Sequence, residues 1–143
     1  MSKVLVTYWS GTGNTEKMAQ LITEGAKAKG ADVDCKVVSQ VNADAALGYD
    51  ILAIGSPSMG AEVLEEGEIE PFVEAIEGRL DGRKLGIFGS YGWGDGEWMR
   101  NWTERMLKAG ANLLDGEGFM VHETPEGEDA EKCKAFGERL AGF

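Results

Sequence analysis

The sequence has little cysteine, proline and histidine. Of its 143 residues, two are cysteine, three are proline and one is histidine. Cys35 and Cys133 lie far apart and form no CxxC pair, which argues against a disulfide framework and against zinc-ligand spacing. We expect both thiols to be reduced and buried. His122 has no serine or cysteine partner placed near it, so we expect a surface position rather than a catalytic role.

Long apolar runs and an excess of positive charge are also missing. No stretch of 18 apolar residues occurs, and no run of signal-peptide length follows Met1-Ser2-Lys3, so we expect a cytoplasmic protein without a membrane span. Lysine and arginine number 14 against 25 aspartate and glutamate residues, which gives a formal charge of −11. This charge argues against nucleic acid and anionic membranes as partners.

Apolar, β-branched segments alternate with segments of helical period. We expect strands at residues 3–8, 32–38, 50–55 and 84–89, an interrupted fifth strand at about 112–121, and helices at 14–29, 69–77, 97–109 and 129–141. The run Ile51-Leu52-Ala53-Ile54 is typical of a strand buried on both faces of a parallel sheet. The pattern predicts one α/β domain over residues 1–143, with helices on both faces of the sheet.

Three loops of unusual composition follow predicted strands, at residues 9–15, 56–62 and 90–96. Ligands of α/β folds bind at the carboxyl ends of the strands. The first loop, Ser10-Gly11-Thr12-Gly13-Asn14-Thr15, leads into a predicted helix, where successive backbone N–H groups can surround a phosphate. It contains no lysine or arginine, which suits a small monophosphate held by hydrogen bonds.

Other phosphate motifs do not fit this loop. A Walker loop needs a lysine that is missing here, and Glu16 stands where a dinucleotide fingerprint requires its third glycine. A phospho-acceptor domain would need an aspartate where this chain has Gly55-Ser56.

The other two loops offer surfaces for a flat ligand. Met59 presents a soft apolar side chain, and Gly60 in the turn Met59-Gly60-Ala61-Glu62 lets the preceding peptide take two orientations. Trp93 lies between glycines on an exposed turn and needs a planar partner, unless it folds back onto Trp98 or Met99. A flat heterocycle between Met59 and Trp93, with its phosphate at residues 10–15, describes flavin mononucleotide (FMN).

The remaining tryptophans have other expected places. Trp98 and Trp102 are spaced i, i+4 on a predicted helix, which favours packing against the sheet. Trp9 lies beside the phosphate loop, and we expect it to form a wall of that loop.

The chain resembles the short-chain flavodoxins over nearly its whole length. The resemblance lies in residues 8–16 (YWSGTGNTE), in 88–94 (FGSYGWG), and in Met59-Gly60 followed by the acidic segment 62–66 (EVLEE). It implies a five-stranded parallel sheet of order 2-1-3-4-5. It also implies a non-covalently bound FMN that transfers one electron at a time at low potential.

By position, the resemblance assigns a role to each loop. Ser10, Thr12, Asn14 and Thr15 resemble the phosphate ligands, and Met59 and Trp93 the two faces of the flavin sandwich. Gly60 resembles the residue whose carbonyl turns to flavin N5 when the semiquinone forms, and Glu62 the acceptor for the ring N3–H. Two positions depart from the family pattern. Family members often have aspartate or serine at the position of Ala61, and a hydroxyl-bearing residue near the position of Pro57. The complete expected cofactor-binding set is Ser10, Gly11, Thr12, Gly13, Asn14, Thr15, Pro57, Ser58, Met59, Gly60, Ala61, Glu62, Ser90, Tyr91, Gly92, Trp93 and Gly94.

These residues predict a monomeric electron carrier without a substrate of its own. Its acidic rim would dock onto basic patches of reductases and oxidoreductases. Glu62, Glu65, Glu66 and Asp95 would oppose the second reduction, although Glu65 and Glu66 are equally compatible with a plain solvated surface. The alternatives are an FMN-dependent NAD(P)H reductase of the same fold, for which the chain offers no second nucleotide pocket, and a flavin-free binding module.

Overall fold

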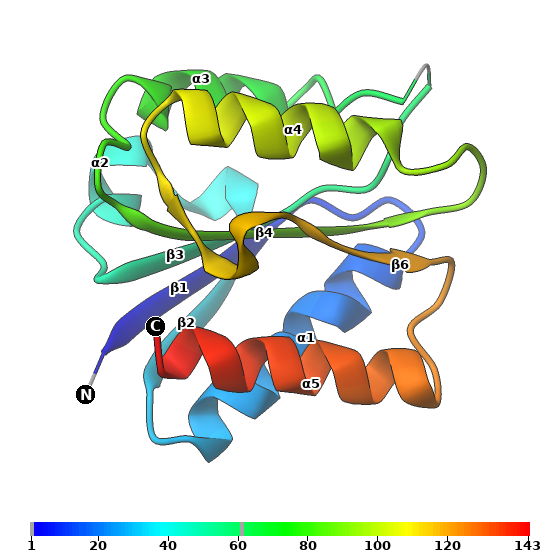
Figure 1. Ribbon diagram of the computed structural model, residues 1–143, viewed down its shortest axis with the longest axis horizontal. Coiled ribbons are helices and arrows are strands. Elements are labelled where there is room, and N and C mark those ends of the chain that lie inside the picture. Colours follow the sequence, from blue (N-terminus) through cyan, green and yellow to red (C-terminus); the bar gives the residue numbers. More distant parts are fainter. Residues whose placement is uncertain (1, 61) are drawn as a thin grey trace.

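One parallel sheet forms the centre of the computed structural model, which describes residues 2–60 and 62–143 (Figure 1). The sheet contains β1 (Lys3–Tyr8), β2 (Asp32–Val37), β3 (Ile51–Gly55), β4 (Lys84–Tyr91), β5 (Asn112–Leu113) and β6 (Phe119–His122). The strands run in the order β2-β1-β3-β4-β5, and β6 also pairs with β4. The predicted order 2-1-3-4-5 is confirmed, with two short strands sharing the fifth position.

The fifth position is interrupted, as the sequence predicts. β5 pairs with Lys84 and Leu85 at the start of β4, and β6 pairs with the end of β4, from Phe88 to Tyr91. Between them the short 3₁₀ helix η2 (Leu114–Gly116) contains Asp115 at φ 63°. This left-handed residue turns the chain out of the sheet before β6 returns to it.

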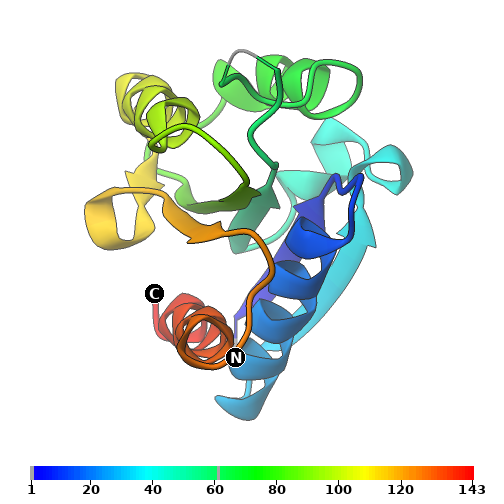
Figure 2. The same cartoon turned by 90° about the vertical axis from the view of Figure 1, so that its right-hand side faces the viewer.

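Helices cover both faces of the sheet, which confirms the predicted layers (Figures 1 and 2). They are α1 (Asn14–Ala28), α2 (Ala43–Ala46), α3 (Ile69–Glu77), α4 (Glu97–Lys108) and α5 (Glu128–Ala141), with a 3₁₀ turn η1 (Val38–Gln40). α1 and α5 lie on one face, and α3 and α4 on the other. The sequence missed α2 and η1, because segments of three or four residues are too short to show a helical period.

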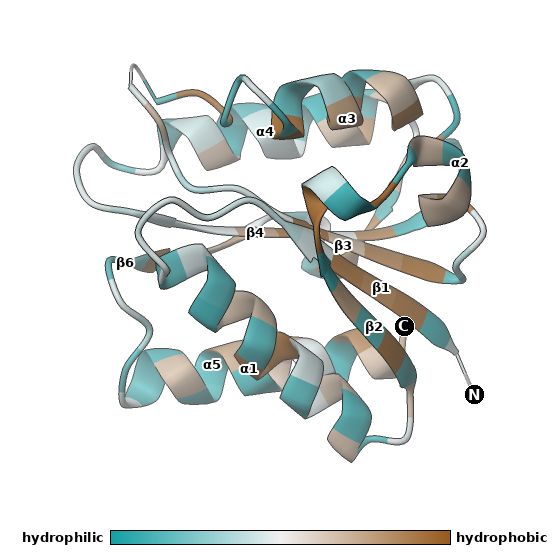
Figure 3. Ribbon diagram, turned by 180° about the vertical axis from the view of Figure 1, so that it is seen from behind, coloured by the Kyte–Doolittle hydropathy of each residue, from teal (hydrophilic) through white to brown (hydrophobic). Residues whose placement is uncertain are grey.

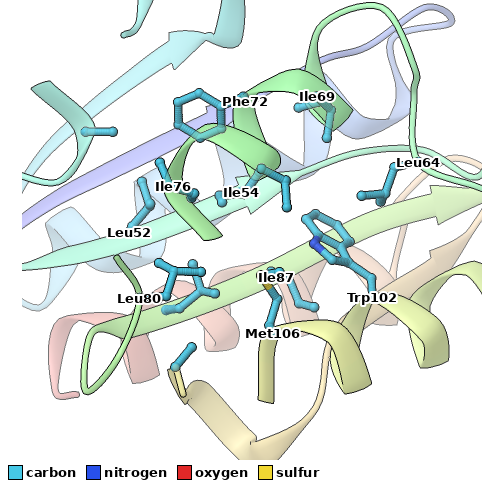
Figure 4. Packing of buried hydrophobic residues seen from close by; sticks show 14 of the residues in the cluster. Leu52, Ile54, Leu64, Ile69, Phe72, Ile76, Leu80, Ile87, Trp102 and Met106 are labelled. Atoms are coloured by element: carbon cyan, nitrogen blue, oxygen red, sulfur yellow. The ribbon is translucent and has the colours of Figure 1, made fainter. Parts of the chain in front are cut away.

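The apolar strands are enclosed between the polar outer faces of the helices (Figure 3). Alternate residues of β1 enter two core clusters: Leu5 packs with α3 and α4, whereas Val4 and Val6 pack with α1 and α5. Trp98 and Trp102 are buried on the α4 side at 1% and 2% exposure, as expected, and Trp102 lies among the aliphatic side chains of α3 and the sheet (Figure 4).

α1 and α5 approach each other through glycines. A Cβ atom at Gly25 would collide with the carbonyl of Lys134, and one at Gly137 with the carbonyl of Ile22. The second half of α1 therefore packs backbone to backbone against α5, which fixes how these two helices lie against each other.

The cysteine prediction is half correct. Cys133 on α5 is fully buried, but Cys35 on β2 is exposed. β2 is the edge strand of the sheet, and only Val33 among its residues is buried, so this strand has no second covered face for a thiol. Among the described residues, no helix is both long and apolar enough to cross a membrane.

Candidate functional site

The three unusual loops meet at the carboxyl edge of the sheet, the edge that Figure 2 faces. Together they line a cavity of about 260 Å³. Its lining residues come from the loop after β1 and the start of α1, from the loop after β3, and from the end of β4 with the residue that follows it: Trp9, Ser10, Gly11, Thr12, Asn14, Thr15, Pro57, Ser58, Met59, Ser90, Tyr91 and Gly92.

The first loop ends in the N-terminus of α1. Gly13 stands before the helix at φ 98°, and its N–H donates to Ser10 Oγ at 3.1 Å. Lys17 N makes the first helical bond, to Gly13 O at 3.0 Å, so the N–H groups before it have no acceptor within the helix. These donors and the helix dipole favour an anion at this place.

Trp9 forms a wall of this loop, as expected. A Cβ atom at Gly11 would lie 3.0 Å from the Trp9 ring, so the indole covers the loop backbone. Trp9 also packs against the core cluster on the α4 side. The ring therefore limits how far the loop backbone can move.

Two buried hydroxyls join the first loop to the third. Thr15 and Ser90 are exposed by only 1% and 4%, and their hydroxyl oxygens lie 3.1 Å apart. One of the two hydroxyls donates its proton to the other. The hydroxyl that accepts keeps its own proton, which it can donate to a ligand. The Ser90 carbonyl also accepts from Ser58 N at 3.0 Å, which ties the second loop to the third.

The second loop closes into a hairpin. Met59 and Val63 exchange both backbone hydrogen bonds, at 2.9 and 3.0 Å, so the turn is one residue longer than the predicted turn from Met59 to Glu62. Gly60 lies at φ 44°, the region that favours glycine. Ala61, one of the expected site residues, lies outside the described residues.

Ser58 carries an unsatisfied hydroxyl beside the cavity. Its Oγ is buried and has no hydrogen-bond partner among the described residues, although the residue lines the cavity. A buried hydroxyl without a partner costs about 1–3 kcal/mol. A ligand with polar edges would remove this cost, and a flavin ring system has such edges.

The third loop presents Trp93 to solvent. Its side chain is 62% exposed, whereas Trp98 and Met99 are buried, so Trp93 does not join them in the core. Instead, Tyr91 packs against Trp98 with ring centroids 5.6 Å apart. The indole therefore lies free at the edge of the site, available to a planar ligand.

Glu62 links the second loop to the third. Its carboxylate accepts from Glu97 N, the first residue of α4, at 3.1 Å. The glycine at 94 is needed there, because a Cβ atom on it would lie 2.5 Å from Glu62 Oε1. The contact of Glu62 with a flavin N3–H stays a prediction.

Not every expected residue lines the cavity. Gly13, Gly60, Glu62, Trp93 and Gly94 lie outside its lining. Gly13 instead precedes α1 as its N-cap residue, and the other four lie on the second and third loops. The remaining expected residues within the described ranges all contribute to the lining.

The acidic residues near the site have different surroundings. Glu65 is 8% exposed, and its carboxylate accepts from the N–H groups of Gly67, Glu68 and Ile69 at 2.7, 2.8 and 2.9 Å. It therefore caps α3 rather than lying on a solvated surface. Glu66 is exposed, and Asp95 pairs with Arg100 at 3.0 Å.

The segment after β6 also reaches the site, and sequence reasoning missed it. His122 Nε2 lies 3.2 Å from the carbonyl oxygen of Gly92, and Glu123 N donates to Tyr91 O at 2.8 Å. Thr124 Oγ1 donates to Asn14 Oδ1 at 2.9 Å. His122 is exposed, as predicted. Thr124 and Asn14 are 110 positions apart, and no local pattern signals such a contact.

Comparison with known proteins shows which family the chain resembles. The sequence model of the family described as Flavodoxin matches residues 6–137. A flavodoxin of Clostridium beijerinckii is 50% identical, with 96% of this chain and 99% of that protein aligned. A flavodoxin of Megasphaera elsdenii is 44% identical, with 96% and 98% aligned.

The structural comparison agrees. The solution structure of two-electron reduced Megasphaera elsdenii flavodoxin superposes with a TM-score of 0.89, at 42% identity, over 98% of this chain and 99% of that one. These relatives are named as flavodoxins, and the reductase alternative is not favoured. The chain belongs to the flavodoxin family, whose members are small electron carriers that bind FMN.

Proposed function

We propose that residues 1–143 form one FMN-binding unit that transfers single electrons at low potential between redox proteins. One observation carries this proposal: a single cavity joins the phosphate loop, residues 10–15, which contains no cation, to Met59 and to the Ser58 hydroxyl, which has no partner among the described residues. The donors at one end suit a phosphate, and the apolar wall with a free polar atom suits a flavin ring. The residues present therefore fit FMN.

The phosphate would be held by neutral donors. The N–H groups at the start of α1 and the side chains of Ser10, Thr12, Asn14 and Thr15 supply them. Ser10 Oγ accepts from Gly13 N, so its own proton stays available for a phosphate oxygen. Hydrogen bonds to an ionised acceptor are about twice as strong as neutral ones, so several can replace a lysine.

The ring system would lie at the rim, between Met59 and Trp93. FMN, when bound, supplies reversible one-electron chemistry. Met59 lines the cavity, and the Trp93 indole is exposed and unpacked, which leaves its face available for stacking. Gly60 and Glu62 lie on the same hairpin as Met59, where their backbone and carboxylate can contact polar ring edges.

Neutral surroundings and nearby acids would make the second electron hard to add. The phosphate loop contains no cation, so the charge of the ligand is not compensated there. A carboxylate about 10 Å away, at an effective dielectric constant of about 20, opposes an added charge by roughly 1.7 kcal/mol. This corresponds to roughly 70 mV for each acid before screening.

Flavodoxins pass electrons to redox partner proteins, and we propose that this chain docks as a monomer onto basic patches of such partners. The formal charge of −11 and the acids Glu62 and Asp95, on the loops that carry Met59 and the exposed Trp93 indole, support this mode of docking. The cytoplasmic location stays a prediction.

An anaerobic titration with dithionite tests the proposal. The purified protein should bind FMN one to one, and its spectra should pass through a third species between the oxidised and fully reduced forms. Addition of NADH alone should leave the spectrum unchanged, because the chain is a carrier rather than a reductase. A protein that rejects FMN, or that is bleached rapidly by NADH, would contradict it.

A further inference from the structure

We propose that Thr124 is a positioning residue that sets the preference of this chain for a phosphorylated flavin. Its hydroxyl donates to Asn14 Oδ1 at 2.9 Å. With Oδ1 occupied by this contact, the NH₂ group of the Asn14 amide would be left to donate to a phosphate at residues 10–15. The inference rests on the proposed function, because it assumes that the phosphate of FMN lies at residues 10–15.

The chemistry of the amide requires such a partner. An asparagine side chain has an acceptor at one end and two donors at the other, whereas phosphate oxygens accept hydrogen bonds. Asn14 therefore helps to bind phosphate only when Nδ2 faces the loop, which directs Oδ1 away from it. A hydroxyl on the outer side stabilises this orientation by donating to Oδ1, and Thr124 supplies that hydroxyl.

The orientation matters more in this loop than in one that contains a lysine. Residues 10–15 include no cation, so each neutral donor contributes a larger share of the phosphate affinity. An amide that flips would place Oδ1 against phosphate oxygens, and the two acceptors would repel each other. The Thr124 contact disfavours this flip before the ligand arrives.

The backbone around Thr124 holds its hydroxyl in place. Glu123 N donates to Tyr91 O at 2.8 Å, His122 Nε2 lies 3.2 Å from Gly92 O, and the following Pro125 is buried. The hydroxyl is thus presented from an anchored segment rather than from a free loop. Preorganisation of this kind lowers the entropy lost on binding.

Matched variants and two ligands test the proposal. Thr124→Val removes the donor and keeps the shape, whereas Thr124→Ser keeps the donor. The dissociation constants of FMN and of riboflavin, which lacks the phosphate, are measured with the cofactor-free protein by flavin fluorescence. Thr124→Val should raise the dissociation constant of FMN about threefold to tenfold and leave that of riboflavin unchanged. Thr124→Ser should bind both ligands as the unsubstituted protein does. In an Asn14→Ala background, Thr124→Val should have no further effect.

The possible outcomes test the positioning role of Thr124 separately from the proposed phosphate site. An equal loss of FMN and riboflavin affinity in Thr124→Val would show a purely structural role and overturn the inference, as would no loss for either ligand. If the unsubstituted protein bound FMN no more tightly than riboflavin, the phosphate site itself would be wrong and the inference would fail with it. Thermal unfolding of each cofactor-free variant checks that the fold is retained.

Discussion

At the scale of single residues, the site consists of neutral polar groups held in place by one another. Ser10 is bonded to Gly13, Thr15 to Ser90, and Asn14 to Thr124. Each pair leaves a donor that can turn toward a ligand, because hydroxyls and amides both donate and accept. Ser58 is the exception among these side chains, since its buried hydroxyl has no partner within residues 2–60 and 62–143.

The Ser58 hydroxyl should act in opposite directions with and without the cofactor. Ser58→Ala should raise the free energy of unfolding of the cofactor-free protein by about 1 kcal/mol, because an unsatisfied buried group is removed. The same change should weaken FMN binding about threefold to tenfold. Urea unfolding and FMN titration measure the two effects.

Ser56→Ala is the matched control for Ser58→Ala. The Ser56 hydroxyl already accepts from Glu65 N at 3.1 Å, so its removal should destabilise the cofactor-free protein. If Ser58→Ala destabilised that protein as much as Ser56→Ala does, the Ser58 hydroxyl would have a partner after all.

Gly60 should influence the first reduction step. Its φ of 44° lies where a Cβ atom costs about 1 kcal/mol, although a Cβ there would meet no neighbouring atom. Gly60→Ala should therefore strain the turn between Met59 and Val63 and shift the first one-electron potential by about 40 mV. Spectroscopic redox titration measures this shift. Gly78→Ala, far from the site at φ −75°, should leave the potential unchanged.

At the scale of elements, Glu65 connects the second loop to α3. Its carboxylate accepts hydrogen bonds from the N–H groups of Gly67 and Glu68, just before that helix, and of Ile69, its first residue, and its own N–H donates to Ser56 Oγ. From the sequence, Glu65 and Glu66 are equivalent members of an acidic run. Burial separates them, and the structural role of Glu65 depends on where α3 begins.

Removal of the Glu65 carboxylate should therefore destabilise the protein. Glu65→Ala should lower the free energy of unfolding by about 2–3 kcal/mol, because three N–H groups lose their acceptor. Glu66→Ala changes an exposed neighbour and should stay within about 0.5 kcal/mol. Urea unfolding of the cofactor-free variants compares them, and equal effects would contradict the capping role.

At the scale of the whole molecule, alkaline pH should destabilise the fold. Burial raises the pKa of the Cys133 thiol from 9.0 to about 12, and burial together with the Glu16 hydrogen bond raises the pKa of Tyr8 from 10.0 to about 12. Both groups are neutral when protonated. Their stabilising effect is complete below the unfolded pKa values and is lost as the pH rises toward 12.

Urea unfolding between pH 8 and pH 11 measures this loss. The free energy of unfolding should decrease above about pH 9, and Cys133→Ala and Tyr8→Phe should each make the decrease shallower. A constant free energy of unfolding over this range would show that neither group titrates abnormally.

The net charge should control association with partners. With a formal charge of −11, electron transfer to a cationic redox protein should be at least about tenfold slower at 1 M salt than at 10 mM salt, because screening removes the attraction. Stopped-flow kinetics at several ionic strengths measure it. An anionic acceptor protein is the control, and its reaction should become faster with salt.

Local patterns account for most of the fold that could be predicted. The continuous apolar run of β3 and the helical periods of α1, α3, α4 and α5 are properties of neighbouring residues. The glycine-rich loops after β1, β3 and β4 could be assigned to one site because parallel strands end at the same edge of a sheet. The exposure of Cys35 could not be predicted from the sequence, because it depends on β2 being the edge strand of the sheet.

The sequence by itself determined the layered α/β fold, the three loops of the site and the family, since these rest on spacing within short segments. Only the tertiary structure separated Glu65 from Glu66, buried the Ser58 hydroxyl away from any partner in the described part of the chain, and brought Thr124 to Asn14. Such features arise from contacts between residues far apart in the chain. No period or motif encodes them, because they exist only once the backbone has packed.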